Sequence, residues 1–172
     1  MANVPGAGWG IHTTLCYLER GDAYLMLYRV KKENDANQGK YVGVGGKFED
    51  GESPEECVIR ECREETGLTL TDYCYRGIVT FVSDRWGAEY MHLFTATGWT
   101  GEETVCDEGE LRWIRKADLM QLPMWEGDAV FLKLLEENAP FFSLKLRYEG
   151  ERLAEAALNG RNIPVGRREE IL

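Results

Sequence analysis

Long apolar runs are missing from this chain: nowhere in its 172 residues do 18 apolar residues follow one another. The N-terminus also lacks a basic segment followed by an apolar stretch, so we expect neither a membrane-spanning helix nor a secretory signal. Basic residues are in the minority, because 20 Lys and Arg stand against 30 Asp and Glu and give a formal net charge of -10. A nucleic acid polymer is therefore not the expected partner, since proteins that bind one usually carry a basic surface.

Cysteine pairs are also missing. The five cysteines form an odd set with neither a Cys-x-x-Cys pair nor a zinc-ligand array: Cys16, Cys57, Cys62, Cys74 and Cys106. We expect them to be reduced interior thiols of a cytoplasmic protein. Apolar residues make up 44% of the chain, which is enough for the core of one domain of ordinary size. We therefore predict a single domain over residues 1–172.

Apolar and β-branched runs predict strands, and the longer periodic runs predict helices. The expected strands are Ile11 to Leu18, Ala23 to Val30, Tyr41 to Val44, Tyr73 to Val82, Tyr90 to Thr97, Leu111 to Ile114 and Phe142 to Leu146. The expected helices are Pro54 to Thr66 and Asp128 to Glu137, with a short helical turn at Ala117 to Met120. Many strands interleaved with few helices indicate an α/β fold in which a mixed sheet is packed between helices.

Two polar segments and two histidines complete this survey. The loop from Lys32 to Lys40 is polar, so we expect it to be mobile and able to act as a lid. The tail from Asn159 to Leu172 combines Gly and Pro with many charges, so we expect it to be loosely held or to serve in contacts that the sequence does not assign. His12 and His92 lie in strand-like segments without a nucleophilic partner in sequence, so we interpret both as structural.

The best-specified helix of the chain begins after Ser53. Ser53 is a suitable N-cap, Pro54 suits the first helical position, and Glu56 stands three residues after the cap, as in a capping box. Gly67 supplies the end of the helix. The local pattern thus predicts a helix over residues 54–66.

Three carboxylates on this helix suggest a metal site. Glu61, Glu64 and Glu65 have the i, i+3, i+4 spacing that places side chains on one helical face, and they border its apolar side. An exposed acidic helix is the plain alternative. Acids beside the core edge, however, repel one another and lose hydration, and oxygen ligands of this kind suit Mg²⁺ or Mn²⁺. Arg60 is positioned to brace these ligands.

A glycine loop precedes the helix. Val42 to Val44 is a short apolar stretch that runs into Gly45 and Gly46, where the backbone can turn sharply and approach a ligand. With Lys47 and Glu52 following, the loop is a candidate cradle for a metal-complexed diphosphate. An ordinary strand-to-helix turn is the alternative.

The stretch from residue 46 to residue 68 resembles the Nudix box, G-x5-E-x7-R-E-U-x-E-E-x-G-U, where U is a bulky aliphatic residue. The matching positions are Gly46, Glu52, Arg60, Glu61, Glu64, Glu65, Gly67 and Leu68, and the one departure is Cys62 at the first U. The resemblance implies a Nudix-like α/β/α sandwich and a Mg²⁺ cofactor, with Mn²⁺ as a substitute. It further implies that the metal is held by Glu61, Glu64 and Glu65, with Glu52 in support and the Gly45 carbonyl as a further ligand.

Weaker signals outside the box resemble the MutT-type hydrolases of oxidised purine nucleoside triphosphates. By this resemblance Glu108 completes the metal site, Arg29 contacts phosphate, Trp125 stacks on the base and Asp128 hydrogen-bonds the edge of the base. Val42 departs from the pattern, because a mammalian relative carries a base-reading asparagine there.

Each of these four residues also has a simpler interpretation. Trp125 could only fill the core, and Arg29 could begin a basic run that keeps a loop in water. Asp128 could be the N-cap of the helix that follows it. Glu110 competes with Glu108 for the metal site, because both lie in the same acidic segment.

The resemblance implies hydrolysis of a small-molecule nucleotide, with 8-oxo-dGTP as the substrate and 8-oxo-dGMP and pyrophosphate as the products. Other nucleoside diphosphate derivatives, such as ADP-ribose, a dinucleoside polyphosphate or a nucleotide sugar, are alternative substrates. A non-catalytic nucleotide sensor on the same fold is a second class of function. A calcium module is disfavoured, because residues 49–52 lack the spacing of an EF-hand loop.

Overall fold

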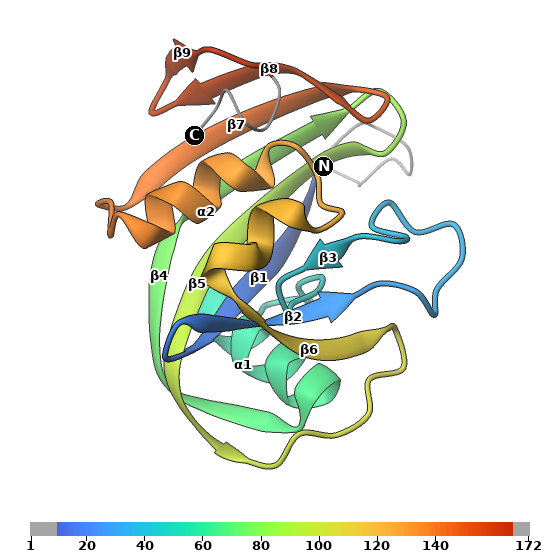
Figure 1. Ribbon diagram of the computed structural model, residues 1–172, viewed down its shortest axis with the longest axis vertical. Coiled ribbons are helices and arrows are strands. Elements are labelled where there is room, and N and C mark those ends of the chain that lie inside the picture. Colours follow the sequence, from blue (N-terminus) through green and yellow to red (C-terminus); the bar gives the residue numbers. More distant parts are fainter. Residues whose placement is uncertain (1–9, 167–172) are drawn as a thin grey trace.

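Nine strands and three helical segments make up the computed structural model, which describes residues 10–166 (Figure 1). The strands are β1 (Ile11–Arg20), β2 (Ala23–Tyr28), β3 (Tyr41–Val42), β4 (Leu68–Ser83), β5 (Gly87–Gly101), β6 (Glu110–Arg115), β7 (Phe142–Glu149), β8 (Arg152–Leu158) and β9 (Arg161–Ile163). The helices are α1 (Pro54–Thr66), α2 (Asp128–Glu136) and the 3₁₀ helix η1 (Lys116–Gln121). No helix in this part of the chain is long and apolar enough to cross a membrane.

All strands join one mixed sheet in the order β3-β2-β1-β5-β4-β7-β8-β9, with β6 paired to β2. The β1–β5 and β4–β7 pairs are parallel, and the other pairs are antiparallel. The sheet opens between β1 and β2, because β2 pairs with β1 only over Ala23–Leu25. The glycine loop lies alongside β1 there, where Val44 bridges to Cys16 and Lys47 to Thr13.

Side chains on the two faces of β1 belong to two different cores. Tyr17 packs with the α2 side chains, including Phe131, whereas Cys16 and Leu18 pack with Val58 and other side chains of α1. Alternation along a strand sends neighbouring side chains to opposite faces, so α1 and α2 cover opposite faces of the sheet (Figure 1). The predicted α/β/α sandwich with a mixed sheet is confirmed.

Helix α1 has the predicted bounds and the predicted caps. The Ser53 side chain accepts the Glu56 N–H, and the Glu56 side chain accepts the Ser53 N–H in return. Gly67 closes the helix in the left-handed conformation, with φ of 79°. An N-cap of this kind typically stabilises a helix by about 1 kcal/mol, so the site-bearing helix is defined by its own local sequence.

The end of the described chain differs from the prediction. Asn159 and Gly160, both with positive φ, form the turn of a hairpin between β8 and β9, so the expectation of a loosely held tail is wrong for this part. Strand β8 was not predicted, because its small and charged residues lack the β-branched pattern. Residues 167–172 of the predicted tail lie outside the described residues.

The cysteines follow the prediction with one exception. Four of them are buried and all five are free thiols, but Cys74 is exposed. The prediction of an interior thiol is wrong at Cys74, because the burial pattern of β4 leaves this position facing outward.

Candidate active site

The three box glutamates leave α1 in different environments. Glu65 is only 8% exposed and Glu61 is partly buried, whereas the Glu64 side chain is 56% exposed. The predicted position of the acids beside the apolar side of the helix therefore holds, with Glu65 deepest and Glu64 at the rim.

Arg60 ties this helix to the loop before it. Its Nη1 donates to Glu61 at 2.8 Å and to Glu64 at 3.2 Å. Its Nη2 donates to Glu52 at 2.9 Å and to the Lys47 carbonyl at 3.0 Å. This agrees with the bracing role predicted for Arg60. The hydrogen bonds from Arg60 also lower the pKa of Glu52 to about 2.

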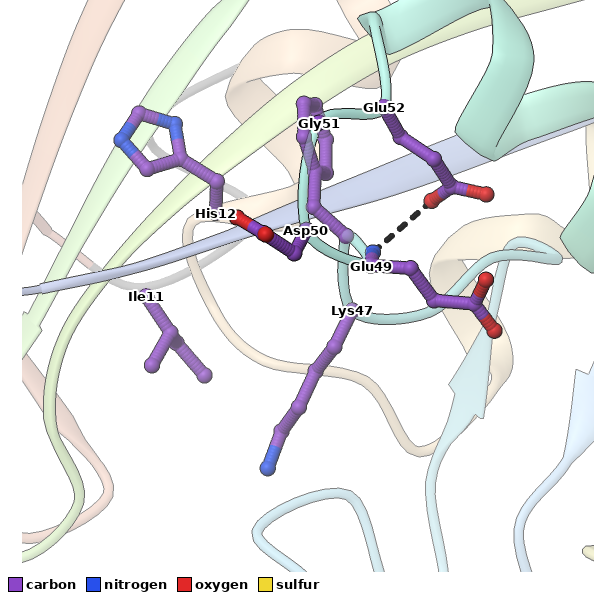
Figure 2. A pocket seen from close by; sticks show the side chains of 8 residues that line it. Ile11, His12, Lys47, Glu49, Asp50, Gly51 and Glu52 are labelled. Carbon is purple, nitrogen blue, oxygen red and sulfur yellow. Dashed lines mark hydrogen bonds between the residues drawn. The ribbon is translucent and has the colours of Figure 1, made fainter.

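The loop over residues 47–52 lines an open pocket of about 340 Å³ together with Ile11 and His12 (Figure 2). Within this loop, the Glu52 carboxylate accepts the Glu49 N–H at 2.8 Å. The exposed Lys47 side chain points away from both acids (Figure 2). The Lys47 backbone carbonyl thus accepts from Arg60, whereas its side chain extends away from the acids. Contact of the Lys47 side chain with phosphate stays a prediction.

The double glycine is required by close packing. A Cβ on Gly46 would lie 2.4 Å from Cδ of Glu61, and a Cβ on Gly45 would lie 1.8 Å from the Thr14 carbonyl oxygen. The Gly45 N–H donates to Glu65 at 3.2 Å. The loop is thus fitted to the acidic helix, which is more than an ordinary strand-to-helix turn requires.

Glu108 and Arg29 bring two further charges to this site. Arg29 is buried, and it donates to Glu108 at 2.6 Å and to Asp35 at 2.8 Å. The alternative in which Arg29 only keeps a loop in water is wrong, because its guanidinium is enclosed by these acids. Glu110 is exposed and paired with Arg112, whereas Glu108 interacts with Glu65. The geometry therefore favours Glu108 over Glu110 as the partner of the box.

Burial and the closeness of the carboxylates disfavour their ionised forms. Burial and the neighbouring Glu108 raise the pKa of Glu65 to about 9, and burial raises the pKa of Glu61. Within residues 10–166, no three acidic, His or Cys side chains are gathered closely enough to hold a metal ion. The donors are nonetheless carboxylate oxygens, which fit a hard divalent cation.

Trp125 combines features of its two interpretations, as a residue that fills the core and as one that stacks on a base. It is 5% exposed and packs edge-on against Phe81 and Tyr148, with ring centroids 5.1 and 4.8 Å apart. Its indole N–H donates to Asn37 at 2.9 Å, and the Lys40 ammonium lies 4.5 Å from its ring centroid. Trp125 is therefore a core residue that also meets the loop predicted to be a lid. Stacking on a base stays a prediction.

Asp128 is not the N-cap of α2. Gly127 holds that position without a side-chain hydrogen bond, and Asp128 is the first residue of the helix. Asp128 is buried, and its charge adds to the burial that raises the pKa of Tyr17 well above its ordinary value. The capping interpretation is therefore wrong, and contact with the base stays a prediction.

The histidines form a hydrogen-bonded chain on the α1 face of the sheet. Nδ1 of His12 lies 2.9 Å from Nε2 of His92, whose other ring nitrogen meets the Tyr75 hydroxyl. Burial and the neighbouring His12 lower the pKa of His92. These contacts among strand residues are compatible with the structural role predicted for both histidines.

Two acids near the site were missed in the sequence. Asp35 pairs with Arg29, and Glu89 accepts the Thr13 hydroxyl at 2.7 Å. Glu89 comes directly before the predicted strand from Tyr90 to Thr97. Its position two residues before Met91 would have placed it on the same face by period-two alternation. No comparable signal existed for Asp35, which lies in an irregular loop.

Comparisons with known proteins agree with this geometry. The sequence profile of the NUDIX domain matches residues 12–135. An uncharacterized Nudix hydrolase of Bacillus subtilis, YvcI, is 35% identical over 127 residues, which cover 71% of this chain and 77% of that protein. An oxidized purine nucleoside triphosphate hydrolase of Danio rerio is 31% identical over 117 residues, covering 64% of this chain and 71% of that one.

A solved structure is similar over most of the chain. The crystal structure of a MutT protein from Bacillus halodurans has a TM-score of 0.77 at 30% identity, covering 87% of this chain and 97% of that one. The matched profile covers the box, the glycine loop and α1, and it ends within α2. The resemblance seen in the sequence is confirmed: the chain belongs to the NUDIX domain family and is a Nudix hydrolase.

Proposed function

We propose that this Nudix hydrolase is a Mg²⁺-dependent nucleoside triphosphate pyrophosphohydrolase that converts 8-oxo-dGTP to 8-oxo-dGMP and pyrophosphate. The observation that carries the proposal is the meeting of Glu65, Glu108 and Arg29 beside the double glycine. The Danio rerio relative is named as an oxidized purine nucleoside triphosphate hydrolase, which supports oxidised purines as the substrate class.

Oxygen donors of the box and of the loop before β6 would hold the magnesium. These are the carboxylates of Glu61, Glu64, Glu65 and Glu108 and the carbonyl of Gly45. When bound, the metal neutralises charge on the phosphoryl oxygens and lowers the pKa of a water molecule. Arg60 keeps Glu61 and Glu64 in place through its two hydrogen bonds. A box glutamate or Glu108 accepts the proton of the attacking water.

The other groups bind the substrate. Arg29 contacts the phosphates after giving up one of its hydrogen bonds to Asp35 or Glu108. Lys47 and the backbone of Gly45 and Gly46 approach the same phosphates. Trp125 stacks on the purine at the ring face that Lys40 covers in this structure. Asp128 is buried in the first turn of the neighbouring helix and contacts the edge of the base.

A panel of nucleotides tests the proposal by product analysis. The panel contains 8-oxo-dGTP, dGTP, ADP-ribose, a dinucleoside polyphosphate and a nucleotide sugar, each with Mg²⁺. We expect a monophosphate and pyrophosphate from the triphosphates, and a kcat/KM for 8-oxo-dGTP at least about tenfold above that for dGTP, which corresponds to about 1.4 kcal/mol of discrimination. A higher kcat/KM for ADP-ribose, the dinucleoside polyphosphate or the nucleotide sugar would reject 8-oxo-dGTP as the substrate and identify that compound class instead. No hydrolysis of any member would indicate a nucleotide sensor.

A further inference from the structure

Glu89 lies beside the proposed base site and has no role in the function proposed above. In the pairing of β4 with β5 it stands directly opposite Phe81, so the two side chains share one face of the sheet. Phe81 in turn packs edge-on against Trp125. Strand register therefore brings an acid next to Phe81, the ring that packs against the proposed stacking residue Trp125.

The surroundings of Glu89 hold its carboxylate in one orientation and leave one of its oxygens able to accept a hydrogen bond from a ligand. The buried Thr13 hydroxyl donates to Oε1 at 2.7 Å, and among the described residues Glu89 forms no ion pair. Oε2 is left to accept a further hydrogen bond. Burial raises the pKa of Glu89, whereas the charges of Lys47 and Arg29 favour its ionised form.

Glu89 also lies where the phosphate cradle and the loop after β2 meet the sheet. Lys47 bridges to Thr13, the residue that holds Glu89. The charges that act on Glu89 belong to Lys47 of the glycine loop and to Asp35 and Arg29, which lie after β2. A nucleotide whose phosphates contact Lys47 and Arg29 and whose base reaches Trp125 would pass in front of this carboxylate.

We propose that Glu89 selects the base by accepting hydrogen bonds from the N–H edge of a 2-amino-6-oxopurine, which makes guanine-type nucleotides the substrate class. An ionised carboxylate only accepts hydrogen bonds, and the ring N1–H and the 2-amino group of guanine only donate. Adenine presents an acceptor at N1, which would oppose the carboxylate. This inference rests on the proposed function, because it uses the same base site.

Binding of the monophosphates GMP, IMP and AMP, measured by calorimetry, tests the role of Glu89 without requiring turnover. We expect the wild-type protein to bind GMP at least about tenfold more tightly than AMP. Glu89→Gln should reduce that ratio to near one, since its amide offers a donor to adenine as well as an acceptor to guanine. IMP keeps the ring N1–H but lacks the 2-amino group, so its affinity relative to GMP shows whether Glu89 accepts a hydrogen bond from the 2-amino group.

The controls separate base reading from folding. Glu102→Gln removes an exposed acid just beyond the other end of β5 and should leave the GMP-to-AMP ratio unchanged. Thr13→Ser keeps the hydroxyl and the ratio, whereas Thr13→Val releases Glu89 and should lower the ratio. Thermal unfolding of each variant identifies one that fails to fold, in which case the Thr13 pair decides the test.

The outcomes of this test and of the nucleotide panel are distinct. Equal binding of GMP and AMP by the wild-type protein, or an unchanged ratio in Glu89→Gln, would overturn the role of Glu89 even if 8-oxo-dGTP is hydrolysed. Failure of the panel with a retained, Glu89-dependent preference for GMP would instead refute the proposed hydrolysis of 8-oxo-dGTP and leave the guanine site standing.

Discussion

At the scale of single residues, one guanidinium organises much of the site. Arg60 contacts Glu52, Glu61 and Glu64 at once, so it offsets part of the repulsion that these acids would otherwise exert on one another. Among residues 10–166, Glu65 has no guanidinium partner, and it is buried beside Glu108. The box therefore contains one compensated group of acids and one uncompensated acid, and the second is where a cation has most to stabilise.

Replacing Glu65 tests this division. Glu65→Gln removes the deepest proposed ligand, so we expect kcat with Mg²⁺ to fall by about a thousandfold, which corresponds to about 4 kcal/mol of lost transition-state stabilisation. At a pH above about 9, where Glu65 is ionised beside Glu108, the metal-free variant should be at least as stable as the wild type, because it lacks this buried like-charge interaction. Steady-state kinetics and thermal unfolding measure the two effects. Glu110→Gln is the matched control, and near-normal activity of Glu65→Gln would reject its role.

Replacing Trp125 tests the base site. Trp125→Ala removes a stacking surface, so we expect KM for purine triphosphates to rise at least about tenfold while KM for inorganic triphosphate stays within about twofold. The variant also loses core packing against Phe81 and Tyr148, so the assays belong at a temperature where circular dichroism shows it folded. An equal rise of KM for both substrates would remove Trp125 from the base site.

The pKa of Glu52 predicts a pH dependence of stability. Its folded-state pKa is about 2, below the ordinary value of 4.5, because Arg60 stabilises the ionised form. The contribution of Glu52 to stability is therefore complete above about pH 4.5 and is lost as the pH falls towards 2. Urea unfolding at several pH values should show a difference between wild type and Glu52→Gln that shrinks over this window. A constant difference would mean that the pair with Arg60 does not shift this pKa.

Contacts between residues close in the sequence could be predicted, and contacts between distant residues could not. The box acids and Arg60 lie within one helix, so spacing alone placed them together. Arg29 and Glu108 are 79 positions apart, and the contact of Asn37 with Trp125 spans 88 positions. Such contacts depend on how the strands pair. The sequence therefore offered candidates there and could not show which acids would enclose Arg29.

At the scale of elements, the loop between β2 and β3 lies against Trp125, the centre of the proposed base site. Asn37 and Lys40 contact Trp125, and Lys40 also pairs at 2.8 Å with Glu151 of the turn between β7 and β8. A purine that stacks on Trp125 needs the ring face that Lys40 now covers. The predicted lid is thus connected at its far end to a hairpin that the sequence did not reveal.

Loosening this connection should assist binding. The Glu151 side chain is 75% exposed, so its ion pair with Lys40 contributes at most about 1 kcal/mol. Glu151→Gln removes the pair without touching the site, and we expect KM for purine triphosphates to fall by at most about fivefold with kcat unchanged. Glu155→Gln, which removes an exposed acid of β8 that pairs with Arg147, is the control. A higher KM in Glu151→Gln would show that Lys40 supports the bound nucleotide instead.

Prediction of the elements succeeded where local sequence decides the structure. Helix α1 has the predicted bounds because its caps lie in the chain itself. Strands β8 and β9 were missed because Arg152–Leu158 is rich in small and charged residues and becomes a strand by pairing with β7. Strand β4 likewise begins at Leu68, five residues before the predicted start, because β5 pairs with it along that length.

At the scale of the whole molecule, both cores depend on the central strand β1. Its side chains alternate between the α2 face and the α1 face, and the α1 face carries the box while the α2 face includes Trp125. The opening between β1 and β2 lets the glycine loop reach from one face towards the other. The acids proposed to bind the metal and the proposed base site therefore belong to one cooperative structure and are positioned by the same sheet.

The charge of the whole chain predicts how salt and polyanions affect the enzyme. With a net charge of -10, the protein repels a nucleotide at long range, and salt screens that repulsion. We expect kcat/KM for a triphosphate, at fixed free Mg²⁺, not to fall between about 50 and about 200 mM salt, whereas proteins that bind polymers through phosphate contacts lose about 10³-fold or more in affinity over that range. An RNA oligonucleotide should likewise leave KM unchanged. A steep loss of kcat/KM with salt, together with competition by RNA, would reveal a basic surface and overturn the exclusion of nucleic acid polymers.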